Sequence, residues 1–147
     1  MKHKGSSTFE YSKDRIDDLM RAYDKYISTC GHICMRDVYS SIVEMPSKRF
    51  WVSDTRASLV VSSMLKIGDN ALDGMWPTNK EMYKEIFKRV IKLREENPNY
   101  SILELCTIVV EQPAPKFYLT PGTAKIIVCK SRSQWKREKL KRLRVFL

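Results

Sequence analysis

Residues 43–53, VEMPSKRFWVS, recur 67 positions later as VEQPAPKFYLT at residues 110–120. The register continues without a gap to Val61, which is matched by Val128, and six of the nineteen aligned positions from 43 to 61 are identical. Another six are conservative exchanges, such as Trp51 for Tyr118. Unrelated segments of this composition share roughly one identity over such a length, so the chain is predicted to contain an internal duplication of one supersecondary unit.

Apolar residues spaced by three and four predict three helices in the first half of the chain. The first helix runs from about residue 14 to Cys30, and the second from about Cys34 to just before Pro46, because the residue preceding a proline disfavours helical backbone. Residues 46–52 are then predicted to be extended, and Ser53-Asp54 to cap a third helix.

The same order returns in the second half, with helices predicted at about 78–96, 102–111 and from 121 onward. Thr78 with Glu81, and Ser101 with Glu104, have the spacing of a capping box, and Thr120 precedes a proline at a first helical position. The Val and Ile content of both third helices leaves a strand as the alternative there.

The predicted fold is mainly α, with two tandem three-helix, helix-turn-helix-like units at residues 14–67 and 78–130. Each unit contains one short extended segment. A polar N-terminal segment covers 1–13, and a basic C-terminal helix is predicted within 131–147. In the connector at 68–77, Leu72, Met75 and Trp76 are too apolar for a free linker and are expected to pack against the body.

Positive charge is concentrated at one end of the chain. The net charge is +10, and residues 130–147 carry eight basic side chains against Glu138 alone, whereas residues 1–77 carry eleven basic and ten acidic side chains. A nearly neutral body with a basic end is typical of a polyanion-contacting arm. No apolar run is long enough to span a bilayer and no signal peptide is recognised, so we expect a cytoplasmic protein.

The four cysteines are expected to be reduced thiols in that compartment. The run Cys30-Gly31-His32-Ile33-Cys34 has the composition of a metal site, but its one-residue gaps are tighter than the usual Cys-x₂₋₄-Cys spacing and no fourth ligand is evident. This favours an ordinary loop over a zinc site. No cofactor is expected.

Catalytic residues are scarce in the sequence. Only His3 and His32 are present among histidines, and there is no phosphate loop, paired metal-binding carboxylates or His-Glu-x-x-His pattern. A protein that is not an enzyme is therefore expected.

The repeated segment and the basic end supply the predicted nucleic-acid contacts. Exposed aromatic and cationic side chains stack on bases and hold phosphates, so Trp51 and Tyr118 are candidate stacking or interface aromatics; the alternative is that the repeated rings are simply buried. As in a helix-turn-helix reader, the starts of the third helices add Ser53, Asp54, Thr55, Ser58, Thr120 and Thr123 as candidate contacts. The predicted cationic contacts are Lys48, Arg49, Arg56, Lys116, Lys125, Arg132, Lys136, Arg137, Lys139, Lys141, Arg142 and Arg144.

The repeated Pro-x-x-Lys/Arg-Phe-Trp/Tyr pattern resembles that of small uncharacterised basic proteins encoded by bacterial mobile elements and phages. The resemblance covers most of residues 14–130 and implies a DNA-associated or virion-associated role.

The sequence therefore predicts a DNA-binding protein, with a regulatory role as one use of that binding. RNA and an acidic protein surface remain alternative partners, and a membrane surface ranks below them. The rival function is a structural or assembly protein whose interface anchors are Trp51, Trp76 and Tyr118. The oligomeric state is left open.

Overall fold

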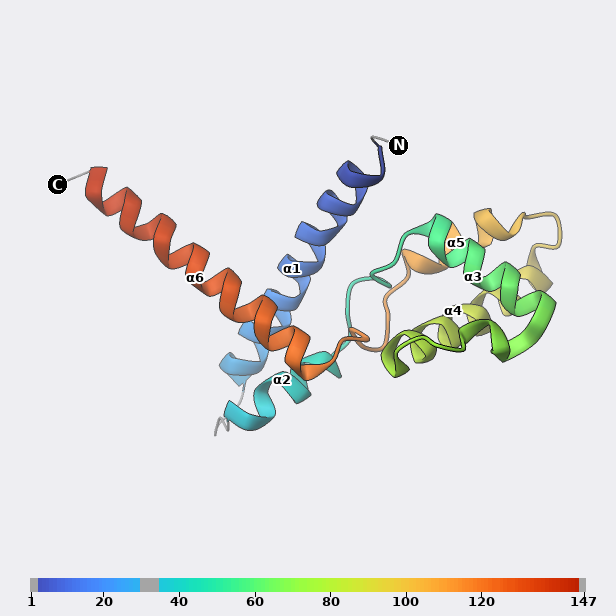
Figure 1. Ribbon diagram of the computed structural model, residues 1–147, viewed down its shortest axis with the longest axis horizontal. Coiled ribbons are helices and arrows are strands. Elements are labelled where there is room, and N and C mark those ends of the chain that lie inside the picture. The colour runs from blue at the N-terminus through green and yellow to red at the C-terminus, as the bar shows by residue number, and fades with distance from the viewer. Residues whose placement is uncertain (1–2, 30–34, 146–147) are drawn as a thin grey trace. The chain divides into compact units, whose positions relative to one another are not determined.

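The computed structural model describes the backbone of residues 3–29 and 35–145, and the surroundings of side chains at 12–29 and 37–144. The mainly helical fold is confirmed, and the described residues contain no strand. The helices are α1 (His3–Thr29), α2 (Met35–Val43), α3 (Asp54–Ile67), the short 3₁₀ helix η1 (Gly68–Leu72), α4 (Pro77–Glu96), α5 (Ile102–Val110) and α6 (Pro121–Val145) (Figure 1). None of the described helices is long and apolar enough to cross a bilayer.

Three of the predicted helix starts are confirmed by side-chain caps. The hydroxyl oxygens of Ser53, Ser101 and Thr120 accept hydrogen bonds from backbone amides three residues later, at 3.1, 3.2 and 3.2 Å. Each bond satisfies an amide that has no partner within its helix.

Three other boundaries differ from prediction. The cap expected at Thr78 is wrong, because Pro77 is already the first residue of α4 and Trp76 occupies the cap position without a side-chain hydrogen bond. α1 begins at His3, so residues 3–13 are helical rather than a separate polar segment. The basic end is not a helix of its own but the continuation of α6.

The chain forms two compact units, which differ from the predicted ones in the placement of the third helices. Unit 1 consists of Met1–Met45 with Leu119–Leu147, and unit 2 of Pro46–Tyr118. In unit 1, α6 packs against α1 and α2; in unit 2, α3 packs against α4 and α5 (Figure 1). The predicted boundaries at 14–67 and 78–130 had kept each third helix with the two helices preceding it. The duplication itself stays a prediction.

The core of unit 1 joins the inner faces of its three helices. Its buried members come from α1, α2 and the first two turns of α6: Leu19, Ala22, Tyr23, Val38, Tyr39, Ile42, Val43, Ala124 and Val128. Asp18 is buried beside them and accepts a hydrogen bond from Arg21 at 2.7 Å, which compensates the carboxylate for lost water.

The core of unit 2 gathers residues from α3, α4, α5 and the two repeated segments. Phe50, Val61, Ile86, Leu105 and Val109 are fully buried within it. The connector contributes Leu72, which is buried, and Met75, which packs partly against the core. Trp76 does not pack as predicted: it is 75% exposed. Gly74, at φ 83°, turns the backbone just before Trp76, a conformation that residues with a Cβ rarely adopt.

The two repeated segments pair with each other inside unit 2. The Ser47 amide donates to the Ala114 carbonyl at 3.0 Å, and the Ala114 amide donates back to the Ser47 carbonyl at 3.1 Å. These two residues are equivalent positions of the repeat. The buried Ser47 hydroxyl lies within donating distance of two further equivalent groups, the Arg49 carbonyl at 2.7 Å and the Lys116 carbonyl at 3.4 Å. The repeated motif is therefore a structural junction.

Stability of unit 2 is expected to fall at alkaline pH because of Cys106. Burial, with a smaller contribution from Asp54, raises the pKa of this thiol from 9.0 to about 11. The folded state holds the proton more tightly than the unfolded state, so the stabilisation is complete below pH 9.0 and is lost as the pH rises toward about 11. The free energy of unfolding, measured with urea below pH 9.0 and near pH 11, gives the size of the decline. In Cys106→Ala this free energy should depend less on pH. An equal decline in both proteins would contradict the role of the Cys106 thiol.

Candidate nucleic-acid interface

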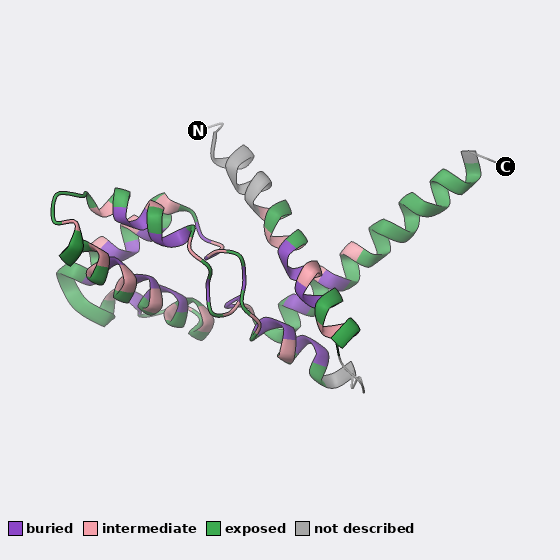
Figure 2. Cartoon of the chain, turned by 180° about the vertical axis from the view of Figure 1, so that it is seen from behind, coloured by how far each residue is buried: buried purple, intermediate pink, exposed green. Residues whose placement is uncertain are grey.

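Helix α6 is divided by burial into two halves. Ala124 and Val128 are buried in unit 1, whereas every residue from 132 to 144 is exposed (Figure 2). We call residues 132–144 the distal half of α6. Its length of thirteen residues corresponds to roughly 20 Å of helix, and all of its side chains are exposed.

Arg132 marks the point where α6 leaves its unit. Its Nη1 atom donates to the Tyr23 hydroxyl at 3.2 Å, and its guanidinium lies 5.8 Å from the centre of the Tyr23 ring. Because Tyr23 is buried in α1, this contact ties the start of the distal half to unit 1.

A second contact fixes α6 against α2. The Tyr39 hydroxyl and the Cys129 thiol are 3.7 Å apart, within the range of a sulfur hydrogen bond. Burial, followed by this hydrogen bond, raises the pKa of Tyr39 to about 12. The two contacts together fix residues 121–132 of α6 against α1 and α2, and the distal half extends from there.

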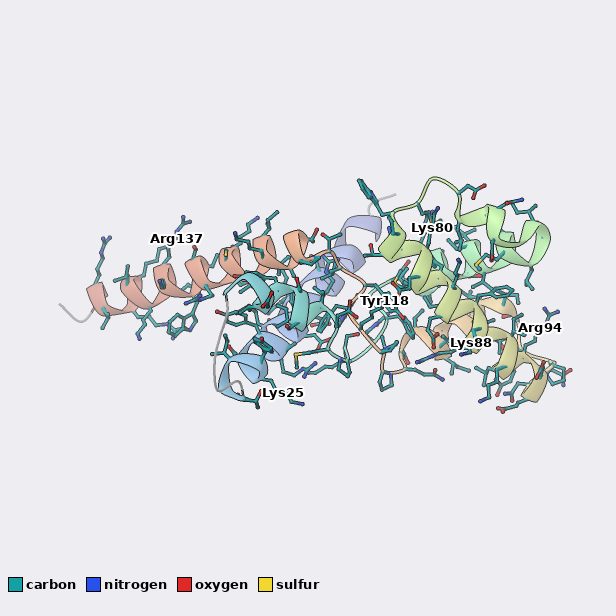
Figure 3. The ribbon with its side chains drawn as sticks, turned by 90° about the horizontal axis from the view of Figure 1, so that it is seen from below. Lys25, Lys80, Lys88, Arg94, Tyr118 and Arg137 are labelled. Atoms are coloured by element: carbon teal, nitrogen blue, oxygen red, sulfur yellow. The ribbon has the colours of Figure 1, made fainter. Side chains whose placement is uncertain are left out.

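The cations of the distal half have no ion pair with the described residues. Seven basic side chains stand against Glu138 alone in residues 132–144. Besides Arg132 they are Lys136, Arg137, Lys139, Lys141, Arg142 and Arg144, all exposed. Figure 3 shows the Arg137 side chain directed away from the helix. Lys139 lies over the exposed Trp135 ring, with Nζ 5.0 Å from its centre.

The predicted cations of the repeated segments are used inside unit 2 instead. Arg49 donates from Nε to the Phe50 carbonyl and from Nη2 to the Val52 carbonyl, each at 3.1 Å. Lys116 forms an ion pair with Glu81. Arg49 thus bonds within its own segment and Lys116 ties the second segment to α4, and only Lys48 of the predicted cations there is exposed.

The predicted stacking aromatics, Trp51 and Tyr118, also have partners inside unit 2. Tyr118 is 7% exposed and its ring stacks on Phe50 with centres 6.0 Å apart, so a base cannot reach its face. Trp51 is half-buried, with the Arg49 guanidinium 5.4 Å from its ring centre. The sequence left open the alternative that the repeated rings fill a core, and this alternative describes Tyr118. Burying an aromatic ring stabilises the folded state more than leaving the ring in water does.

Most candidate contacts at the starts of the third helices are exposed, and several of them also take part in capping or local hydrogen bonds. In α3, Ser53 is the cap and Asp54 accepts a hydrogen bond from Thr107 of α5 at 3.2 Å, while Ser58 is half-buried. Thr55 and Arg56 are exposed there. In α6, the exposed Thr120 and Thr123 bond to each other, and Lys125 is exposed.

One cationic surface was missed by the sequence predictions. Lys80, Lys84 and Lys88 follow one another at intervals of four on α4, and we call them the lysine ridge. Lys84 and Lys88 are exposed and Lys80 is half-buried. The signal was present in the sequence, because the predicted helix 78–96 already had basic residues recurring at every turn.

No group of three or more His, Cys, Asp or Glu side chains that could hold a metal ion occurs among the described residues. Cys30, His32 and Cys34 lie outside them.

Comparison of the chain with family models, curated proteins and solved structures finds no match.

Proposed function

We propose that the protein binds double-stranded DNA, without catalysing a reaction, through the distal half of α6. One observation carries this proposal: all thirteen residues from 132 to 144 are exposed, and seven of them are basic against one acidic residue. If the distal half bound the same segment of a second copy, two strongly positive helices would repel each other. The partner is therefore expected to be a polyanion.

The distribution of charge around the distal half of α6 favours binding in a nucleic-acid groove over binding to a flat membrane surface. At about 100° per residue, Arg137, Lys141 and Arg144 lie on one side of α6, and Lys136, Lys139 and Arg142 lie on the opposite side. A membrane surface would meet only one of these sides, and an interfacial helix would place apolar residues there. A helix in a groove has phosphates along both flanks, which matches two opposed sets of cations.

The dimensions favour DNA over double-stranded RNA. An α-helix with its side chains is about 10–12 Å across, and the major groove of B-form DNA is about 12 Å wide. The major groove of A-form RNA is too narrow to admit a helix. In this proposal Lys125, which is exposed near the start of α6, is an additional phosphate contact.

An assembly function is the second candidate because of Trp76. This side chain is 75% exposed, which suits an interface anchor, whereas Tyr118 and Trp51 are already packed in unit 2. Light scattering after size-exclusion chromatography separates the two functions: a large defined oligomer that does not bind DNA would favour assembly.

The DNA proposal is tested by binding of the full chain to a labelled duplex across a salt series. Six phosphate contacts predict a slope of about −5 in log K against log salt, and an affinity loss of roughly 1,000-fold between about 50 and 200 mM. A variant ending at Ser133 keeps Arg132 on Tyr23 and therefore keeps unit 1 intact. It should lose the salt-sensitive binding; equal binding by both proteins would refute the assigned role of the distal half.

A further inference from the structure

Trp76 is more exposed than any other large apolar side chain described in the structure. It stands immediately before Pro77, at the start of α4, while its neighbours Leu72 and Met75 pack on the unit 2 core. The packing of unit 2 therefore does not require an indole ring at this position. An exposed tryptophan next to a cationic helix is a platform on which a planar group can stack.

The lysine ridge continues from Trp76 along α4. The Lys80 amide donates to the Trp76 carbonyl at 3.0 Å, which places the two residues one turn apart. Lys84 and Lys88 follow at further turns, each about 6 Å along the axis, on a side of α4 away from the buried Met82 and Ile86. Figure 3 labels Lys80 and Lys88 on this helix.

The carboxylates nearest the ridge are engaged with other cations. Glu81 forms an ion pair with Lys116, and the Glu85 carboxylate accepts a hydrogen bond from Arg89 Nε at 3.0 Å. The ridge lysines themselves form no ion pair with the described residues. Three positive charges therefore line one face, with an aromatic ring at its end.

We propose that Trp76 and the lysine ridge form a binding site for single-stranded nucleic acid, with a base stacked on the indole and the phosphates held by Lys80, Lys84 and Lys88. In a duplex the base faces are covered by their neighbours, so an exposed ring is of use only with an unpaired base. Aromatic rings beside a cationic track are the usual elements of single-strand binding. This site belongs to unit 2 and does not depend on the duplex contact proposed for α6.

The test measures anisotropy of a labelled mixed-sequence 12-mer single strand with the full chain and four variants. Trp76→Ala should weaken binding by about 5- to 150-fold, the range expected for one stacked base, and Trp76→Phe should retain most of the affinity. Replacing the three ridge lysines by alanine should reduce the salt slope by about 2. The control replaces three exposed lysines elsewhere, Lys13, Lys25 and Lys66, and should leave the slope almost unchanged.

The same proteins are then measured on a duplex, which separates this inference from the proposed function. Trp76→Ala should leave duplex affinity within about twofold, because stacking on an unpaired base is not available there. Unchanged single-strand binding by Trp76→Ala, or equal losses on both ligands, would overturn the single-strand site while leaving duplex binding by α6 standing. Single-strand binding without duplex binding would refute the role of α6 alone.

Discussion

Replacing Arg137, Lys141 and Arg144 by alanine is expected to weaken duplex binding by roughly 500-fold at ~0.1 M salt. Each neutralised phosphate contact contributes close to one decade under that condition, and the three side chains lie on one side of the distal half of α6. The slope of log K against log salt should become shallower by about 2.7. Alanine is a strong helix former, so the helix itself should persist. Anisotropy titrations at four or more salt concentrations provide both values.

The control for the loss of net charge is a variant in which Lys13, Lys25 and Lys66 are replaced by alanine. It loses the same three charges from exposed positions outside the distal half of α6. Its affinity should stay within a few fold of the parent protein. If both triple variants weaken binding equally, the interaction depends on overall charge and the distal half has no special role.

Phe50→Ala is expected to lower the free energy of unfolding by about 3–5 kcal/mol. Phe50 is fully buried, stacks on Tyr118 and lies under the Arg89 guanidinium, whose carbon is 4.9 Å from the ring centre. Its amide also donates to the Val110 carbonyl at 3.0 Å, so the ring sits at the junction of the two repeated segments. Guanidinium unfolding followed by circular dichroism measures the change.

Trp76→Ala is the matched control for this experiment, because it removes a larger ring that is 75% exposed. Its effect on stability should be within about 0.5 kcal/mol. Should Phe50→Ala prevent folding altogether, Phe50→Leu provides a milder measure, with an expected loss of about 1–2 kcal/mol. A loss for Phe50→Leu no larger than that for Trp76→Ala would contradict the central position of this ring.

Local elements were predictable from the sequence because they depend on neighbouring residues. In the predicted helix 78–96, apolar residues spaced by three and four predict an inner face of Met82, Ile86, Val90 and Leu93. The first three are buried in α4 and Leu93 is partly buried. The caps at Ser101 and Thr120 follow from side chains that can reach an amide three residues away. The cap at Thr78 failed because the preceding proline takes the first helical position itself.

The pairing of helices was not predictable in the same way. α3 and α6 follow similar segments and carry matching apolar residues, such as Val61 and Val128, so either could cover either preceding helix pair. The choice depends on the path of residues 46–53 and 111–120, which pair through the two reciprocal hydrogen bonds between Ser47 and Ala114. Periodicity contains no information about such contacts.

The candidate interface was predicted in part. The cations of α6 were found from composition, and the structure places them on an exposed helix. Arg49, Lys116 and Tyr118 have partners inside unit 2, which the sequence did not indicate, because a cation beside an aromatic ring has the same sequence pattern whether the pair is exposed or packed. The lysine ridge was overlooked because its lysines alternate with glutamates, and the sequence does not show that Glu81 and Glu85 bond elsewhere.

The discontinuity of unit 1 has a consequence for the order in which the protein matures on the ribosome. Unit 2 is one uninterrupted stretch, Pro46–Tyr118, and all of it is synthesised before α6. The 25 residues of α6 then require roughly 1–5 s of further translation. Until they emerge, Leu19, Val38 and Ile42 of the earliest helices lack the partner that buries them. The helices made first are thus completed last, by the same segment that carries the cationic half.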